Sequence, residues 1–179
     1  RSDFDASTEF TIITGFSSLE FLVSFFSKAN LTNKHLIRVV LGNEPIYRDL
    51  RREMAFKSLP QEITDYWLLQ NIAANFCWPV LNLIEQIRAG RVEFRLLDGL
   101  HAKIYVGEHT AMLGSSNFSQ SGLYLQDEAN IRAVRTETPA DFEAFRAIAN
   151  HYYDKAQYAN EFNLELLQKL NRLVTWREA

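Results

Sequence analysis

The residues best suited to chemistry lie in the segment 101–130. His101 and Lys103 are separated by one residue, in the alternating sequence His-Ala-Lys-Ile-Tyr. On a β-strand, whose side chains alternate between faces, His101, Lys103 and Tyr105 would share one face. An imidazole beside an ammonium on one face is unfavourable unless an anion lies there. The pair therefore predicts an anion-binding face, although alone it also fits a solvated sheet surface.

Gly114, Ser115, Ser116 and Asn117 follow a second short strand. Glycine permits a sharp turn, and hydroxyl and amide groups can donate hydrogen bonds to anionic oxygens. Glu128 follows Asn117 by eleven residues. Its carboxylate could accept the second imidazole N–H and fix the histidine tautomer, as the acid of a catalytic triad does. Taken separately, the turn and the acid are also ordinary surface features.

In order and spacing, this segment resembles the phospholipase D superfamily motif, His-x-Lys-(x)4-Asp-(x)6-Gly-Ser-x-Asn with a downstream acid. The residues that fit directly are His101, Lys103, Gly114, Ser115 and Asn117. Glu128 falls where the small bacterial nucleases of the family carry their glutamate. Two departures exist: Glu108 occupies the aspartate position, and the gap to Gly114 is one residue shorter. The resemblance implies that the residue at the aspartate position does not contact the phosphate.

The chemistry of these residue types agrees with the resemblance. Phosphodiester hydrolysis needs a nucleophile, a proton donor for the leaving oxygen and positive donors around the phosphoryl oxygens. His101 can attack phosphorus and form a phosphohistidine, which water then opens. Lys103 and Asn117 can stabilise the oxygens, a task that metal ions perform in other enzymes. No carboxylate cluster suited to Mg²⁺ flanks the motif. We expect catalytic His101, Lys103, Asn117 and Glu128, substrate-binding Ser115 and Ser116, and neither metal nor cofactor.

The motif occurs once, whereas the family's mechanism uses two copies, because one histidine cannot easily act on both sides of an in-line displacement. The other histidines, His35, His109 and His151, lack a lysine two residues later. We therefore expect a homodimer whose two motifs face each other across a twofold axis.

Single-motif members of the superfamily are mostly nucleases, and this segment looks most like the helicase-fused and restriction-type group. The resemblance implies a metal-independent DNA endonuclease domain of a larger restriction, repair or helicase protein; DNA is favoured over RNA. A chain that begins without methionine agrees with an excised domain. Two alternatives stay open: a dimerisation or DNA-tethering module that cuts poorly, and a phosphatidyl-group hydrolase or transferase.

Alternating strands and helices must position the motif. Apolar runs and turn residues predict strands at 10–14, 35–41, 92–97, 102–106, 111–114 and 128–134. Helices are predicted at 18–29, 45–57, 61–75, 79–89, 139–157 and 162–176. The pattern indicates an α/β (or α+β) fold with a mixed sheet flanked by helices. We expect one domain over 1–179, in which about residues 158–179 form a helical tail.

Composition limits the remaining classes. The chain has 179 residues, 47% of them apolar, and a formal charge of −3. The charge excludes a generically basic nucleic-acid coat protein but not a locally basic cleft. The single cysteine, Cys77, excludes an intrachain disulfide. No apolar run approaches the ~20 residues of a membrane span. We expect a soluble cytoplasmic protein without a membrane partner.

Overall fold

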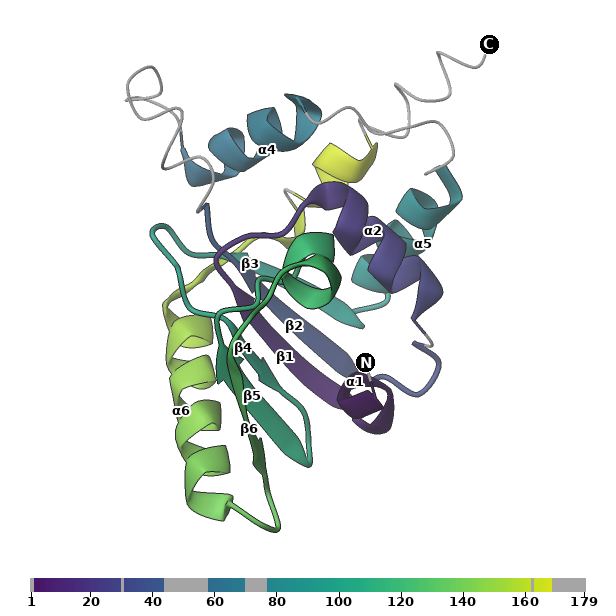
Figure 1. Ribbon diagram of the computed structural model, residues 1–179. Coiled ribbons are helices and arrows are strands. Elements are labelled where there is room, and N and C mark those ends of the chain that lie inside the picture. The colour runs from purple at the N-terminus through teal and green to yellow at the C-terminus, as the bar shows by residue number, and fades with distance from the viewer. Residues whose placement is uncertain (1, 30, 44–57, 70–76, 162, 169–179) are drawn as a thin grey trace.

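The computed structural model describes residues 2–29, 31–43, 58–69, 77–161 and 163–168 (Figure 1). Its strands are β1 (Glu9–Thr14), β2 (Leu36–Leu41), β3 (Val92–Leu96), β4 (Ile104–Val106), β5 (Thr110–Gly114), β6 (Asn130–Val134) and β7 (Gln157–Tyr158). Its helices are α1 (Ser2–Ala6), α2 (Leu19–Lys28), α4 (Leu59–Leu69), α5 (Cys77–Arg88), the π-helical turn η2 (Ser121–Leu125) and α6 (Pro139–Lys155).

The strands form one mixed sheet in the order β6-β5-β4-β1-β2-β3-β7. β1, β2 and β3 are parallel neighbours, whereas β4 runs antiparallel to β1, β5 to β4 and β6 to β5. The mixed sheet flanked by helices confirms the predicted fold class.

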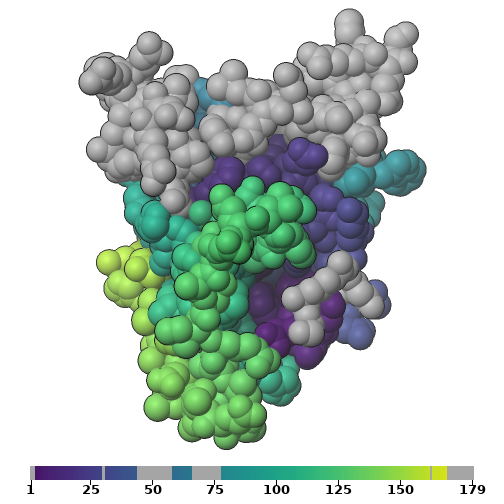
Figure 2. All heavy atoms as spheres, in the orientation of Figure 1, coloured from purple at the N-terminus to yellow at the C-terminus, as the bar shows by residue number. Residues whose placement is uncertain are grey.

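Alternating side chains of the strands build two apolar cores. Phe10 and Ile12 of β1 join the core beneath α2 and α5, whereas Ile13 points to the core beneath α6. Figure 1 shows α2 and α5 on one face of the sheet and α6 on the other. In the space-filling view, the green atoms of η2 lie against the indigo atoms of α2, with the purple atoms of α1 below them (Figure 2).

Helix α2 shows how the sequence specifies these layers. The Ser18 hydroxyl caps the helix by accepting a hydrogen bond of 3.2 Å from the Phe21 N–H. The helix buries Leu22 and Phe26 almost completely against the sheet. Burial of such side chains contributes roughly 1.5–3 kcal/mol each. The predicted helix at 18–29 is therefore confirmed, as α2 (Leu19–Lys28) with Ser18 as its cap.

Several predicted elements differ from the structure. β4 and β6 begin two residues later than predicted, and α4 begins at Leu59. The short elements α1, η2 and β7 were not predicted. The predicted helix 45–57 and the predicted helical residues 70–75 lie outside the described residues. Of the predicted tail, residues 160–161 and 163–168 are helical, and residues 169–179 are not described. No helix in the described ranges is long and apolar enough to cross a membrane.

Candidate active site

The motif segments meet at one end of the sheet strands. β1, β2 and β3 end there because they are parallel, and β4 begins there because it is antiparallel to β1. In the register, Ile13 lies opposite Ile104 and Ile104 opposite Leu113. Gly114, the last residue of β5, pairs with Asn130, the first of β6. We call this the motif end of the sheet and the opposite one the far end.

His101 and Lys103 lie in the segment that enters β4. Both residues precede the first residue of β4, Ile104; His101 is exposed, whereas Lys103 is only 4% exposed. That their side chains share one face stays a prediction. The Lys103 ammonium donates a hydrogen bond of 2.7 Å to the His101 carbonyl. The Lys103 carbonyl accepts a bond of 3.1 Å from the Gly114 N–H. The positive charge of Lys103 is thus held beside the main chain of His101, which is itself exposed.

Asn117 is oriented from the end of β1. Its Oδ1 accepts a hydrogen bond of 3.2 Å from the Phe16 N–H and lies 3.1 Å from the Thr14 hydroxyl, whose single proton also has the Phe16 carbonyl within reach at 2.8 Å. Thr14 is completely buried, and its hydroxyl also accepts a bond of 3.0 Å from the Phe118 N–H. With Oδ1 held in this way, Nδ2 is the group of Asn117 that could donate to a phosphate oxygen. Sequence reasoning missed Thr14; the available signal was a hydroxyl at the end of an apolar strand.

Ser115 joins the end of β5 to the start of β6. Its hydroxyl donates to the Glu128 carboxylate and accepts a bond of 3.0 Å from the Ala129 N–H. Its own N–H donates to the Ala129 carbonyl at 3.1 Å. Glu128 is thereby fixed at the motif end through Ser115. The expected bond from the His101 imidazole to Glu128, and the expected contact of Ser115 with substrate, stay predictions.

Ser116 is 2% exposed, and both its main chain and its side chain accept hydrogen bonds that hold the loop. Its hydroxyl accepts a hydrogen bond of 2.7 Å from Asn130 Nδ2, and its carbonyl accepts one of 2.8 Å from the Tyr105 hydroxyl. Burial and the nearby negative charge of Glu128 raise the pKa of Tyr105, so the phenol stays protonated and donates. The expected contact of Ser116 with substrate is still a prediction, one that this buried position does not favour.

Close backbone packing brings the loop that carries His101 against the ends of β1 and β2. A Cβ atom on Gly42 would lie 2.5 Å from the Leu100 carbonyl oxygen and 2.8 Å from the Gly15 carbonyl oxygen. Next to it, Asn43 Nδ2 donates to Asp98 Oδ1 at 2.8 Å. These residues position the site without carrying its chemistry, and nothing in their spacing along the sequence links them to the motif.

Glu108, at the aspartate position of the motif pattern, lies at the far end of the sheet. Its Oε1 accepts hydrogen bonds from the Thr8 hydroxyl and from the Thr8 N–H (3.0 Å). These bonds lower the pKa of the Glu108 carboxyl. Its N–H donates to the Ser7 hydroxyl at 3.1 Å. Glu108 therefore fastens the segment before β1 to the β4–β5 turn.

Within the described part of the chain, no group of three or more His, Cys, Asp or Glu side chains is arranged to hold a metal ion. The candidate residues at the motif end are instead His101, Lys103, Asn117 and Glu128, of which Glu128 is bonded to the Ser115 hydroxyl.

The match to a family model shows that this chain is a phospholipase D-like domain. The family described as "Cardiolipin synthase, PLD-like domain" matches residues 6–149, a range that includes the whole motif. The chain belongs to this family. No match was found among curated protein sequences.

The solved structures that are similar to this chain share little sequence identity with it. Phosphatidylserine synthase from Haemophilus influenzae Rd KW20 is 16% identical with a TM-score of 0.57, over 93% of this chain and 40% of that one. NucT from Helicobacter pylori is 12% identical with a TM-score of 0.50, over 88% and 86%. TrmBL2, an archaeal chromatin protein, is 10% identical with a TM-score of 0.43, over 87% and 48%. The chain thus spans less than half the length of the synthase and of TrmBL2.

Proposed function

We propose that this domain is a metal-independent DNA endonuclease that acts as a homodimer within a larger restriction, repair or helicase protein. The observation that carries the proposal is the position of an exposed His101 beside the buried Lys103 ammonium, at the same end of the sheet as Asn117. A nucleophile flanked by a cation and an amide is suited to phosphodiester chemistry.

In the proposed reaction, an imidazole nitrogen of His101 attacks phosphorus and the P–O bond to the leaving oxygen breaks. The leaving oxygen takes a proton from His101 of the partner subunit. Water then attacks the phosphohistidine, gives a proton to that second histidine, and releases a phosphate monoester as the N–P bond breaks. One water molecule is consumed for each phosphodiester that is cleaved, and both histidines return to their starting protonation states.

Three neighbours of His101 would support this chemistry. The Lys103 ammonium would stabilise charge on the non-bridging oxygens, and the Asn117 amide would donate to one of them. Glu128, fixed by the Ser115 hydroxyl, would accept from the His101 imidazole and hold its tautomer. Ser115 is then a positioning residue for Glu128.

The homodimer follows from the single motif, because one histidine cannot both attack and protonate on opposite sides of an in-line displacement. NucT supports only the length of the single chain, because a chain of similar length has the same fold. A chain that sediments as a monomer at catalytic concentration contradicts the two-histidine mechanism.

A phosphatidyl-group hydrolase or transferase is the second candidate. The family description names cardiolipin synthase, and one structural neighbour is a phosphatidylserine synthase. The same His-Lys-Asn arrangement would serve a lipid phosphodiester, so the substrate has to be decided by assay. The third possibility, a DNA-tethering module, predicts binding without cleavage.

A matched pair of histidine variants tests the proposal. His101→Ala and His109→Ala both remove an exposed imidazole, the second at the far end of the sheet. Each is assayed beside the parent chain on plasmid, single-stranded DNA and phosphatidylglycerol vesicles in the presence of EDTA. We expect DNA cleavage that His101→Ala lowers at least about 1,000-fold and His109→Ala leaves unchanged.

Equal DNA loss with parent and His101→Ala would indicate a contaminating nuclease and overturn the proposal. Complete dependence on added Mg²⁺ would overturn the metal-independent mechanism. Turnover of the vesicles alone would establish the second candidate, and DNA binding without cleavage the third.

A further inference from the structure

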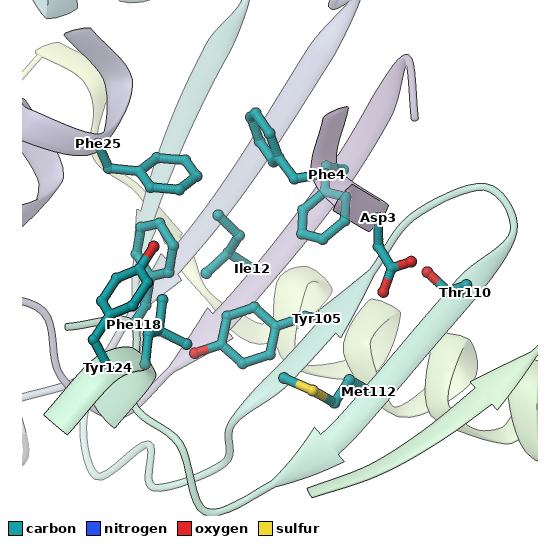
Figure 3. Close-up of a pocket in the computed structure, with 11 residues that line it drawn as sticks. Asp3, Phe4, Ile12, Phe25, Tyr105, Thr110, Met112, Phe118 and Tyr124 are labelled. Carbon is teal, nitrogen blue, oxygen red and sulfur yellow. The ribbon is translucent and has the colours of Figure 1, made fainter. Parts of the chain in front are cut away.

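A pocket with a volume of about 130 Å³ opens between α1, the β4–β5 hairpin and η2 (Figure 3). It lies on the α2 face of the sheet, and none of the motif residues His101, Lys103, Asn117 or Glu128 lines it. Aromatic rings make up most of its wall: those of Phe4, Phe10, Phe25, Tyr105, Phe118 and Tyr124. At one end, Figure 3 shows the Asp3 carboxylate beside the Thr110 hydroxyl, and the hydroxyls of Tyr105 and Tyr124 lie toward the other end.

The aromatic wall is continuous. The Phe25 ring packs edge-on against Phe4 with centroids 5.1 Å apart, and against Phe118 at 4.8 Å. Tyr124 is 57% exposed and lies at the mouth of the pocket. Such a wall offers both ring faces and ring edges, which suits a planar aromatic occupant. An apolar cavity of about 150 Å³ accommodates benzene, so this pocket has room for one six-membered ring.

The carboxylate of Asp3 determines which edge of such a ring can face its end of the pocket. Arg132 pairs with Asp3 through Nη2 (2.7 Å) and Nε (3.1 Å). This pairing lowers the pKa of Asp3, which is therefore ionised at neutral pH. A carboxylate has about four acceptor positions, so Asp3 can accept further hydrogen bonds. A ring with a donor edge complements it, as an acidic side chain does the exocyclic amine of cytosine.

The pocket wall is continuous with the loop that carries Asn117. Phe118 follows Asn117 directly, and the Tyr105 hydroxyl donates to the carbonyl of Ser116, inside the Gly-Ser-x-Asn turn. Gly122 of η2 packs so closely on this loop that a Cβ there would lie 2.5 Å from the Asn117 carbonyl oxygen. A molecule in the pocket would thus contact the same structural unit that holds the candidate site.

We propose that this pocket binds one unpaired pyrimidine base, cytosine in preference to thymine, of a nucleic-acid strand. That the base belongs to the substrate rests on the proposed function. A base pair is wider than a one-ring pocket, so the base enters only from a single strand or after flipping out of a duplex. The pocket therefore narrows the substrate class to single-stranded or locally unpaired DNA.

Methionine-methyl NMR tests the pocket directly. The chain has two methionines, so the signal of Met112, which lines the pocket, is assigned with Met112→Leu. The full chain with His101→Ala, which should bind without cutting, is titrated with deoxycytidine, thymidine and a short-chain phosphatidylglycerol below its micelle concentration. We expect a saturable shift of the Met112 methyl with deoxycytidine at an affinity at least about tenfold above that for thymidine.

Two variants and a control separate the contributions. Asp3→Asn should lower deoxycytidine affinity about tenfold and remove the preference over thymidine. Leu123→Trp, which fills the pocket with a ring of its own, should abolish the shift. Asp5→Asn, an exposed acid on the same helix, should behave like the parent. Circular dichroism verifies that each variant is folded.

The outcomes distinguish this proposal from the proposed function. No Met112 shift with deoxycytidine, an equal response to thymidine, or a shift with the lipid alone would overturn the base pocket even if the chain cuts DNA. Saturable deoxycytidine binding that Leu123→Trp abolishes would support the pocket even if the plasmid assay shows no cleavage.

Discussion

The two ends of the sheet use charged residues for different purposes. At the motif end, Lys103 is held by a backbone carbonyl next to an exposed histidine. At the far end, Lys34 is 5% exposed and donates to the carbonyls of Phe4, Asp5 and Ser7 at the end of α1. Burial lowers the pKa of Lys34. One lysine borders a candidate site, and the other fastens the segment before β1.

Strand β4 explains why a single motif contributes to both ends. Lys103 precedes β4 and Glu108 follows it, so the strand places them at opposite ends of the sheet. Residues close in a motif pattern therefore need not share a task. The following variants test this division, from the largest expected effect to the smallest.

Among the variants that compare the two ends, Lys103→Met should cause the largest loss of activity. Methionine approximates the length of lysine but removes the positive donor, and loss of one such donor costs about 100- to 1,000-fold in kcat. Single-turnover DNA cleavage with EDTA measures the effect. The matched far-end variant, Lys34→Met, should lower thermal stability and leave the kcat of the folded enzyme within about twofold of the parent. A normal kcat for Lys103→Met would remove Lys103 from the mechanism.

Glu128→Gln and Glu108→Gln make the same change at the two ends. We expect Glu128→Gln to lower kcat about 10- to 100-fold, because a neutral amide holds the imidazole less well. Glu108→Gln should weaken the bonds to Thr8, lower the melting temperature and leave kcat unchanged. Steady-state cleavage assays and thermal melts measure both. Equal kcat losses in the two variants would contradict the division between the two ends.

Gly42→Ala should destabilise the motif end. The added Cβ meets backbone on two sides, 2.5 Å from the Leu100 oxygen and 2.8 Å from the Gly15 oxygen. We expect a loss of about 2 kcal/mol in the free energy of unfolding, measured by urea denaturation. Gly107→Ala is the far-end counterpart. Its Cβ meets the Ser7 side chain first, which can rotate, so a smaller loss is expected. The reverse order would show that the loops at the motif end can separate.

Asp3→Asn should have the smallest effect on stability, and one that depends on pH. In the parent chain, the hydrogen bond that Asp3 accepts from Arg132 lowers the pKa of Asp3 from the ordinary value of 3.8. The charged pair therefore stabilises the fold above that value, and the contribution disappears as pH falls through the lower folded pKa. A partly exposed pair contributes about 0.2–1 kcal/mol. Urea denaturation of Asp3→Asn, Arg132→Gln and the double variant at pH 7 and pH 3 measures the coupling, which should shrink at pH 3.

Much of the fold could be predicted from the sequence because apolar periodicity and turn residues are local signals. Ser18, a residue suited to cap a helix, indicates the start of α2, and the β-branched run before Gly15 indicates β1. The short elements α1, η2 and β7 were missed because so few residues carry no clear period. Their formation depends on distant contacts, such as the bonds from Lys34 to the end of α1.

The candidate site divides in the same way. The residues with reactive groups were recognisable because they lie within one short motif. Their supports were not, since Thr14, Gly42 and Asn43 come from the ends of other strands and meet the motif only through the sheet register. The role of Glu108 also required the structure, because its partner, Thr8, lies 100 residues away in the chain.

The hydrogen bond from Tyr105 to Ser116 has a consequence for how the motif tolerates change during evolution. The bond uses the main-chain oxygen of Ser116, which every amino acid possesses. This bond therefore places no demand on the side chain at the variable position of Gly-Ser-x-Asn, where the Ser116 hydroxyl is used separately, as an acceptor for Asn130. Tyr105 has no such latitude: a phenylalanine would leave that oxygen buried without its donor, at about 1–3 kcal/mol. In this turn, sequence constraint lies outside the residues that define the motif.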